Sequence, residues 1–420
     1  MNEKEKNLPS KRVELKILLF ILVITLINYF DRSALAFSIT SVQNAFNIDN
    51  TSFGIIASAF GVGYLVASFF AGFLIDRFGV INTWALAVLV WSITTFCIGL
   101  SSGFWTLFTF RLILGLAEAF HFPALLKTIT DWLEPYYRSR CVSIGLLGVP
   151  LASVIGAPLL TLVIHVFSWR VLFYLLGIVG VIWVVFWLIY FKKIEQKHIP
   201  FSFPVQSSEQ LLKTDIPTSN LTLLKQMFRS RAFVGNCINY FIFGYIIFFA
   251  LNWLPGYFQQ TFHLDILNTG WVIMIPWIIS AIFLILGGFV SDYLWKHTHK
   301  IRVSRILPIA FAILLSGISF FLVSYTKSFT ADIIFLSLGL GFAFFANSAF
   351  YSLNADLFEQ RAGTAQGIIT AFSAFGGILA PYLTGLVTQQ TGSFHSAFYL
   401  ISFLCISGFL QSIFFQKIEE

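Results

Sequence analysis

The chain alternates along its whole length between apolar stretches of about 20 residues and short polar segments. A helix needs about 20 apolar residues to cross the hydrocarbon core of a bilayer, where every backbone polar group must be satisfied internally. The pattern therefore predicts an all-α integral membrane protein with twelve transmembrane helices. The expected spans are 16–37, 52–75, 81–100, 104–129, 139–165, 170–191, 233–257, 267–294, 304–325, 329–355, 362–388 and 393–416.

Composition supports lipid as the solvent for most of the chain. It is 57% hydrophobic and only 11% charged, whereas soluble domains carry about 25% charged residues. The sequence contains no P-loop or metal-ligand spacing, so we expect neither an enzyme nor a primary pump, and no cofactor or bound metal. The four cysteines fall in or beside apolar runs, where cysteine is usually a small hydrophobic residue.

The net charge of +7 is explained by the membrane topology of the chain and does not indicate a nucleic-acid partner. If both termini are cytoplasmic, nearly every Lys and Arg falls in the cytoplasmic segments. Arg170 and Lys327 lie outside, and Arg32 and Arg111 lie within spans. This is the positive-inside asymmetry of membrane proteins. The first apolar run is too long for a signal peptide, so we expect it to remain as the first helix.

The two halves of the chain resemble each other. A polar linker at 192–232 separates an N-terminal six-helix bundle, 1–191, from a C-terminal one, 233–420. Gly72-Phe-Leu-Ile-Asp76 after the second span matches Gly288-Phe-Val-Ser-Asp292 after the eighth. Parallel repeats of this kind predict a binding site at their interface and alternating access by a rocking motion.

Two clusters of ionisable residues lie at membrane depth. Asp31 and Arg32 occupy the first span, and Arg111 and Glu118 occupy the fourth. Such residues are functional by default because burying a charge is expensive. A guanidinium binds a carboxylate through two parallel hydrogen bonds, so we expect Arg32 to anchor an anionic substrate. The alternative is a structural ion pair between Arg32 and an acid of the fourth span.

The rest of the site is expected to be aromatic and moderately polar. Tyr29 lies three residues before Arg32 and can share its helix face. We expect no deep charge in the C-terminal half. The further substrate-binding candidates are Tyr64, Tyr240, Tyr245, Asn252, Asn347, Tyr351 and Thr370, with Asn239 beside them.

Several short sequence motifs, in this order and topology, resemble those of the major facilitator superfamily and, within it, of the anion:cation symporter family. Gly72-x-x-x-Asp76-Arg77-x-Gly79 is similar to the loop motif after the second helix. Asn28-Tyr-Phe-Asp-Arg32, Arg111-Leu-Ile-Leu-Gly-Leu-Ala-Glu118 and Trp253-Leu-Pro255-x-Tyr257 are similar to the symporter family's strings. That family includes bacterial proton-coupled importers of sugar acids and sialin-like animal proteins.

The resemblance implies roles for the charged residues. Glu118 would be the main proton site and Asp31 a second one, with Arg111 close by; the alternative is that Asp31 and Arg111 only hold the first helix against the fourth. His121, one turn beyond Glu118, can tune or relay the proton or be a neutral structural histidine. The gating motif would comprise Gly72, Asp76, Arg77, Gly79, Arg138 and Asp292, which latch the cytoplasmic end.

The predicted function is proton-coupled import of a small organic anion by a monomer in the bacterial inner membrane. A proton-coupled exporter is the first alternative, although Gly148-Val-Pro150 in the fifth span departs from the motif of drug antiporters. A sensor that binds solute without moving it is the second. At two family positions Thr370 and Ala374 replace the usual asparagines. The sequence therefore leaves open whether the substrate is a sugar acid, an aromatic acid, a dicarboxylate or a carboxylate siderophore.

Overall fold

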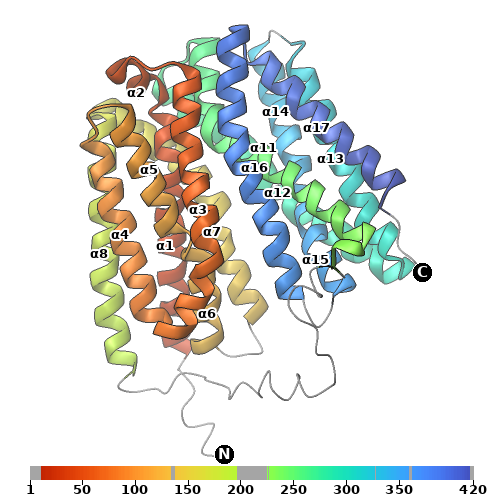
Figure 1. Ribbon diagram of the computed structural model, residues 1–420, viewed down its shortest axis with the longest axis horizontal. Coiled ribbons are helices and arrows are strands. Elements are labelled where there is room, and N and C mark those ends of the chain that lie inside the picture. The colour runs from red at the N-terminus through yellow and green to blue at the C-terminus, as the bar shows by residue number, and fades with distance from the viewer. Residues whose placement is uncertain are drawn as a thin grey trace, which may run out of the picture.

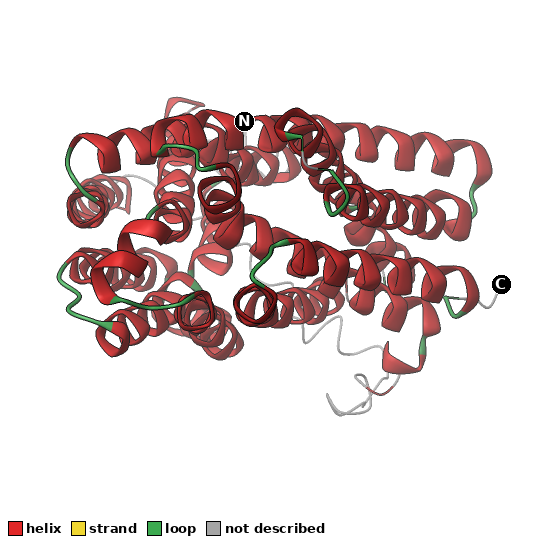
Figure 2. Cartoon of the chain, turned by 90° about the horizontal axis from the view of Figure 1, so that it is seen from above, coloured by secondary structure: helices red, strands yellow, loops and turns green. Residues whose placement is uncertain are grey.

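The computed structural model describes residues 11–133, 138–195, 225, 227–326, 328–358 and 362–416. All regular structure in these ranges is helical (Figure 2). The helices of the first half are α1 (Lys11–Phe37), α2 (Ile39–Phe46), α3 (Asn50–Phe78), α4 (Val80–Gly99), α5 (Phe104–Glu118), α6 (His121–Trp132), α7 (Arg138–Val166) and α8 (Trp169–Glu195). The second half contains α11 (Arg231–Phe262), α12 (Ile266–Thr298), the short π-helix η3 (Arg302–Ile306), α13 (Leu307–Val323), α14 (Phe329–Phe345), α15 (Asn347–Leu357), α16 (Ala362–Thr391) and α17 (His395–Phe414).

Twelve segments are long and apolar enough to span a membrane, which confirms the predicted number. Their positions agree with the hydropathy pattern within a few residues at most ends. The helices up to α8 form one group and those from α11 onward form a second (Figure 1). Most of the predicted linker, 192–232, lies outside the described residues.

Two spans are interrupted near their middle, which the apolar pattern does not reveal. The fourth span consists of α5 and α6, separated by a turn at Ala119 and Phe120. The tenth span consists of α14 and α15, which part at Ala346. These spans occupy corresponding places in the two halves. Interrupted helices of this kind usually border the binding sites of transporters.

The two bundles touch at one end of the molecule, here called the closed end. At this end α1 finishes and α3 begins, and it lies at the top of Figure 1. Across it, the Ser58 hydroxyl donates to the Ile378 carbonyl at 2.7 Å. Thr40 donates to the Gln259 side chain at 2.6 Å. In the described residues, hydrogen bonds between the bundles occur only between Thr40–Ser58 and the facing ends of α11 and α16.

Small residues allow this close approach. A Cβ atom on Gly54 of α3 would collide with the backbone carbonyl of Pro381 in α16. On the other side of the interface, a Cβ on Gly270 of α12 would meet the Thr161 side chain of α7. Contact between helix backbones at small residues is how membrane helices gain packing energy without a hydrophobic driving force between them.

Candidate functional site

An ion pair between the two interior clusters lies at the centre of the candidate site. Nε of Arg32, on α1, donates to Oε2 of Glu118 at 2.7 Å, and these side chains are 7% and 0% exposed. The pairing of Arg32 with an acid of the fourth span was expected as the structural alternative. Only Nε takes part in it. Nη2 is buried without a hydrogen-bond partner among the described residues, so the outer edge of the guanidinium is unpaired.

Three aromatic rings of the N-terminal bundle surround this guanidinium. Its central carbon lies 4.9 Å from the ring centre of Tyr29, 5.1 Å from that of Phe60 and 4.9 Å from that of Tyr64. Cation–π attraction at such distances holds an arginine in place when it is removed from water. The rings stabilise the charge while leaving its hydrogen-bonding edge unoccupied.

The other two charged residues of these clusters, Asp31 and Arg111, form no hydrogen bond or ion pair in the described part of the chain. Asp31 is 1% exposed, and both of its carboxylate oxygens lack a hydrogen bond. Arg111 is 2% exposed, its Nε and Nη1 are unpaired, and its central carbon lies 4.8 Å from the Phe60 ring centre. Among the described ion pairs none joins Asp31 to Arg111, although the two interact electrostatically. Buried groups that lack partners are candidates for ligand or water contacts.

His121 lies in an aromatic compartment at the start of α6. Its Nε2 is 3.2 Å from the Thr25 hydroxyl, and its Nδ1 is buried without a partner. The ring centres of Trp84 and Trp91 lie 5.7 and 6.1 Å away. The structure thus shows a neighbour on one ring nitrogen and leaves both predicted roles, relay and structural histidine, available.

A pair of tyrosines from the C-terminal bundle faces this group. The hydroxyl oxygens of Tyr240 and Tyr351 are 3.1 Å apart. Both residues lie near Tyr64 of the N-terminal bundle, and Tyr240 also lies near Tyr29. Tyr351 keeps 44% of its surface exposed. The tyrosines of the two halves therefore lie near one another beside the Arg32 guanidinium, and a role of Tyr29, Tyr64, Tyr240 and Tyr351 in substrate binding stays a prediction.

Comparisons with known proteins decide the family. The model of the Major Facilitator Superfamily matches residues 21–381, which is most of the chain. The chain belongs to the Major Facilitator Superfamily. It is therefore a membrane transporter and not an enzyme.

Similar proteins include two transporters of Bacillus subtilis (strain 168). A hexuronate transporter is 29% identical over 407 residues, covering 96% of this chain and 95% of the relative. A probable galactarate/D-glucarate transporter is 28% identical over 434 residues, covering 96% and 94%.

Solved structures show the same fold at low sequence identity. A bacterial homologue of the human lysosomal transporter Spinster, in an inward-facing and unoccupied conformation, superposes with a TM-score of 0.77 at 15% identity, over 96% of each chain. A D-xylose–proton symporter gives a TM-score of 0.75 at 14% identity, covering 96% and 97%.

Three other candidate residues of the transporter donate hydrogen bonds within the C-terminal bundle. The Asn252 amide donates to the Phe248 carbonyl of its own helix at 2.7 Å. Thr370 does the same with Gln366 at 2.9 Å. Asn239 donates to Ser412 of α17 at 2.7 Å. Tyr245 is 1% exposed, and the Asn347 carbonyl oxygen is buried without a partner in the described residues.

The predicted gating residues are only partly described. Gly79 ends α3 with φ at 82°, where glycine is favoured, and Arg77 is exposed. Gly72 lies in α3, and the side chains of Asp76 and Arg138 lie outside the described residues. Asp292 lies 3.4 Å from Nη1 of Arg305 and remains 80% exposed.

Two buried charged residues of the C-terminal half lie near its helix ends, so they do not contradict the expectation that this half has no charge deep within a span. Arg305 of η3 is 5% exposed, donates to Asp356 at 2.9 Å and to Ser291 at 2.6 Å, and lies over Trp295. Asp332 of α14 is 1% exposed and accepts a hydrogen bond from Tyr257 at 2.5 Å.

The sequence contains only weak indications that these two charged residues are buried. Sequence reasoning placed Arg305 among the ordinary cytoplasmic cations and Asp332 at a helix end. The serine directly before Asp292 was the only local hint of the Arg305 network. Asn28 was also overlooked. It is fully buried one turn before Arg32, and its side chain lies beside the Glu118 carboxylate.

Proposed function

We propose that the chain is a proton-coupled importer of a small organic anion, with a hydroxylated carboxylate as the first candidate. The 2.7 Å contact between Arg32 and Glu118 carries this proposal. It supports a mechanism in which one guanidinium serves both ligands, holding the proton-binding carboxyl on Nε and the substrate carboxylate on its unpaired edge. The named substrates of the similar Bacillus subtilis proteins, hexuronate and galactarate/D-glucarate, support the class of substrate.

Charge balance links the two ligands. Asp31 and Glu118 offset Arg32 and Arg111, so the empty site is neutral when all four are ionised. A monoanion that binds Arg32 adds an uncompensated negative charge in a region that is poorly solvated. A proton on Glu118 or Asp31 removes that excess. Anion and proton therefore favour each other's binding, and the coupling is reciprocal.

Alternating access follows from the contacts between the bundles. In this proposal both termini are cytoplasmic and the closed end faces outward, so the structure is in an inward-facing state. Substrate and proton enter together when the closed end opens and leave together on the cytoplasmic side. An inward proton gradient then drives import.

The substrate half of the proposal is tested by binding. Arg32→Lys retains the charge but loses the planar fork. Losing one charge-assisted hydrogen bond is expected to weaken D-glucuronate or D-galactarate binding about 10- to 150-fold. Arg12→Lys, at an exposed site at the start of α1, is the matched control. Affinity in Arg32→Lys equal to that of the control would remove Arg32 from the site.

The proton half is tested by transport. Glu118→Gln mimics the protonated carboxyl and is expected to abolish accumulation driven by an acidic exterior while keeping exchange of substrate across proteoliposomes. Substrate affinity of the unaltered protein is expected to tighten as pH falls from 8 to about 5. Affinity that weakens on acidification, with uptake driven by an alkaline exterior, would indicate an exporter.

A further inference from the structure

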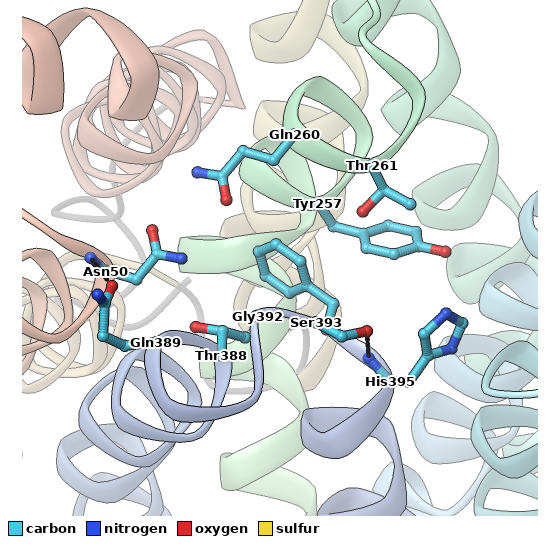
Figure 3. Close-up of a pocket in the computed structure, with 10 residues that line it drawn as sticks. Asn50, Tyr257, Gln260, Thr261, Thr388, Gln389, Gly392, Ser393 and His395 are labelled. Carbon is cyan, nitrogen blue, oxygen red and sulfur yellow. Dashed lines mark hydrogen bonds between the residues drawn. The ribbon is translucent and has the colours of Figure 1, made fainter.

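A second pocket lies at the closed end, away from the charged cluster. It has a volume of 360 Å³, within the range of about 300–1,000 Å³ typical of small-molecule sites. Asn50 of α3 forms its N-terminal wall, and α11, α16 and the start of α17 form the rest (Figure 3). Thr261 and Gln389, which line it, are exposed, so the pocket is reached from the surface of the closed end.

The lining of this pocket is polar but carries almost no charge. Side-chain amides and hydroxyls predominate, and among the described lining residues His395 alone can become a cation near neutral pH. None of the lining residues that the structure describes is Asp, Glu, Lys or Arg. The nearby carboxylate of Asp332 is held behind the pocket by Tyr257. An organic anion would find little compensation here, unlike at Arg32.

Several hydrogen-bonding groups in the pocket are unused. The Asn50 carbonyl oxygen accepts from Gln43 at 2.7 Å, and the Gln389 carbonyl oxygen accepts from the Asn50 backbone at 3.3 Å. The amide NH₂ groups of Asn50 and Gln389 have no partner among the described residues. Nδ1 of His395 is also buried without a partner in that part of the chain. Each is a donor, or for histidine a donor or acceptor, available to a ligand.

Aromatic rings complete the lining. Tyr257 and Phe394 both line the pocket, and in Figure 3 the Tyr257 ring lies on the same side as His395, across from Asn50 and Gln389. Aromatic faces offer a negative quadrupole against which polarised C–H groups pack. Neutral amides combined with ring faces match the chemistry of a compact molecule that carries many hydroxyl groups and no charge.

We propose that this pocket binds an uncharged polyhydroxylated solute of monosaccharide size, and that the bound solute stabilises the closed end. Because Asn50 belongs to one bundle and Gln389 and His395 to the other, a ligand that contacts all three holds the bundles together. The pocket exists only while the two bundles are in contact at this end. Occupancy therefore slows the opening of this end and inhibits transport without competing at Arg32.

Binding to the purified full-length chain in detergent tests the proposal. D-Glucose, D-galactose and myo-inositol are titrated by calorimetry, and at least one is expected to bind saturably in the millimolar range. Asn50→Asp and Gln389→Glu keep the carbonyl oxygens but remove the unused NH₂ groups. Each is expected to weaken that binding about fivefold, the value of one hydrogen bond of ordinary strength.

Two controls separate this site from others. Asn44→Asp makes the same change at an exposed position of α2, on the same end of the molecule, and is expected to bind the sugar like the unaltered chain. Arg32→Lys is expected to leave sugar binding unchanged, so the outcome does not depend on the proposed anion site. Absence of saturable binding by all three solutes would overturn the proposal. Equal affinity in Asn50→Asp, Gln389→Glu and the Asn44→Asp control would also overturn it.

Discussion

Replacing Gly54 by alanine should open the closed end. An added Cβ at this position overlaps the Pro381 carbonyl and lies 3.3 Å from the Tyr382 Cα. Both neighbours are backbone atoms, so neither can move aside by a rotamer change. Overpacking of this kind costs about 1–3 kcal/mol. The contact joins the two bundles and not the interior of either, so the cost falls on the closed state alone.

That cost translates into a population shift. A penalty of about 1–3 kcal/mol moves a two-state equilibrium about 5- to 150-fold toward the state in which the closed end is open. Spin labels on cysteines introduced at Asn44 and Gln390 report the separation of the bundles, since both positions are exposed at this end. The four native cysteines are replaced by alanine in this background. The long-distance population is expected to grow in Gly54→Ala.

Gly103→Ala is the matched control. This glycine also lies at the closed end, its backbone is extended, and an added Cβ meets no atom within 4 Å. Gly103→Ala is therefore expected to keep the distance distribution of the unaltered protein. If Gly54→Ala also keeps that distribution while eluting as a folded protein, the close α3–α16 approach does not control this end.

Two further predictions concern polar contacts near helix ends. The backbone NH of Ser52 donates to Asp49 at 2.8 Å and is the main reason that the pKa of this N-terminal capping carboxylate is lowered. Asp49→Ala should cost about 1 kcal/mol of unfolding free energy near neutral pH, whereas Asp49→Asn should cost little. Because the pKa of Asp49 is lower in the folded state, its carboxylate stabilises the fold above the unfolded-state pKa, and this stabilisation is lost as pH falls through the folded-state pKa. In thermal unfolding, the difference in stability between the unaltered protein and Asp49→Ala should therefore shrink at about pH 3. Arg305→Lys keeps the charge but cannot reach both Asp356 and Ser291, so its unfolding free energy should fall by about 1–3 kcal/mol, whereas Arg77→Lys at an exposed site should show no change.

The apolar pattern was sufficient for the spans because hydropathy is set residue by residue. It could not reveal the interruptions at Ala119–Phe120 and at Ala346, because each span keeps the mean hydropathy of a continuous membrane helix despite the polar residues beside the breaks. A helix and a broken helix of the same composition have the same hydropathy.

The interior charges were recognisable because they lie within otherwise apolar stretches. Their partners were not. Nε of Arg32 pairs with Glu118 because of the way α1 packs against α5. The spacing of residues along one helix does not predict how two helices pack. Arg305 was missed for the opposite reason, since it follows a run of exposed basic residues and only the tertiary fold buries it.

The contacts that join the bundles at the closed end are made entirely by neutral groups in the described residues, chiefly carboxamides, hydroxyls and backbone carbonyls. Dissolved ions screen the attraction between exposed charges over about 10 Å at 0.1 M salt, but they have little effect on hydrogen bonds between uncharged partners. The strength of this closure should consequently be the same in dilute and in saline surroundings. A cell that meets abrupt changes in external salinity would thereby retain the same balance between the two orientations of the carrier.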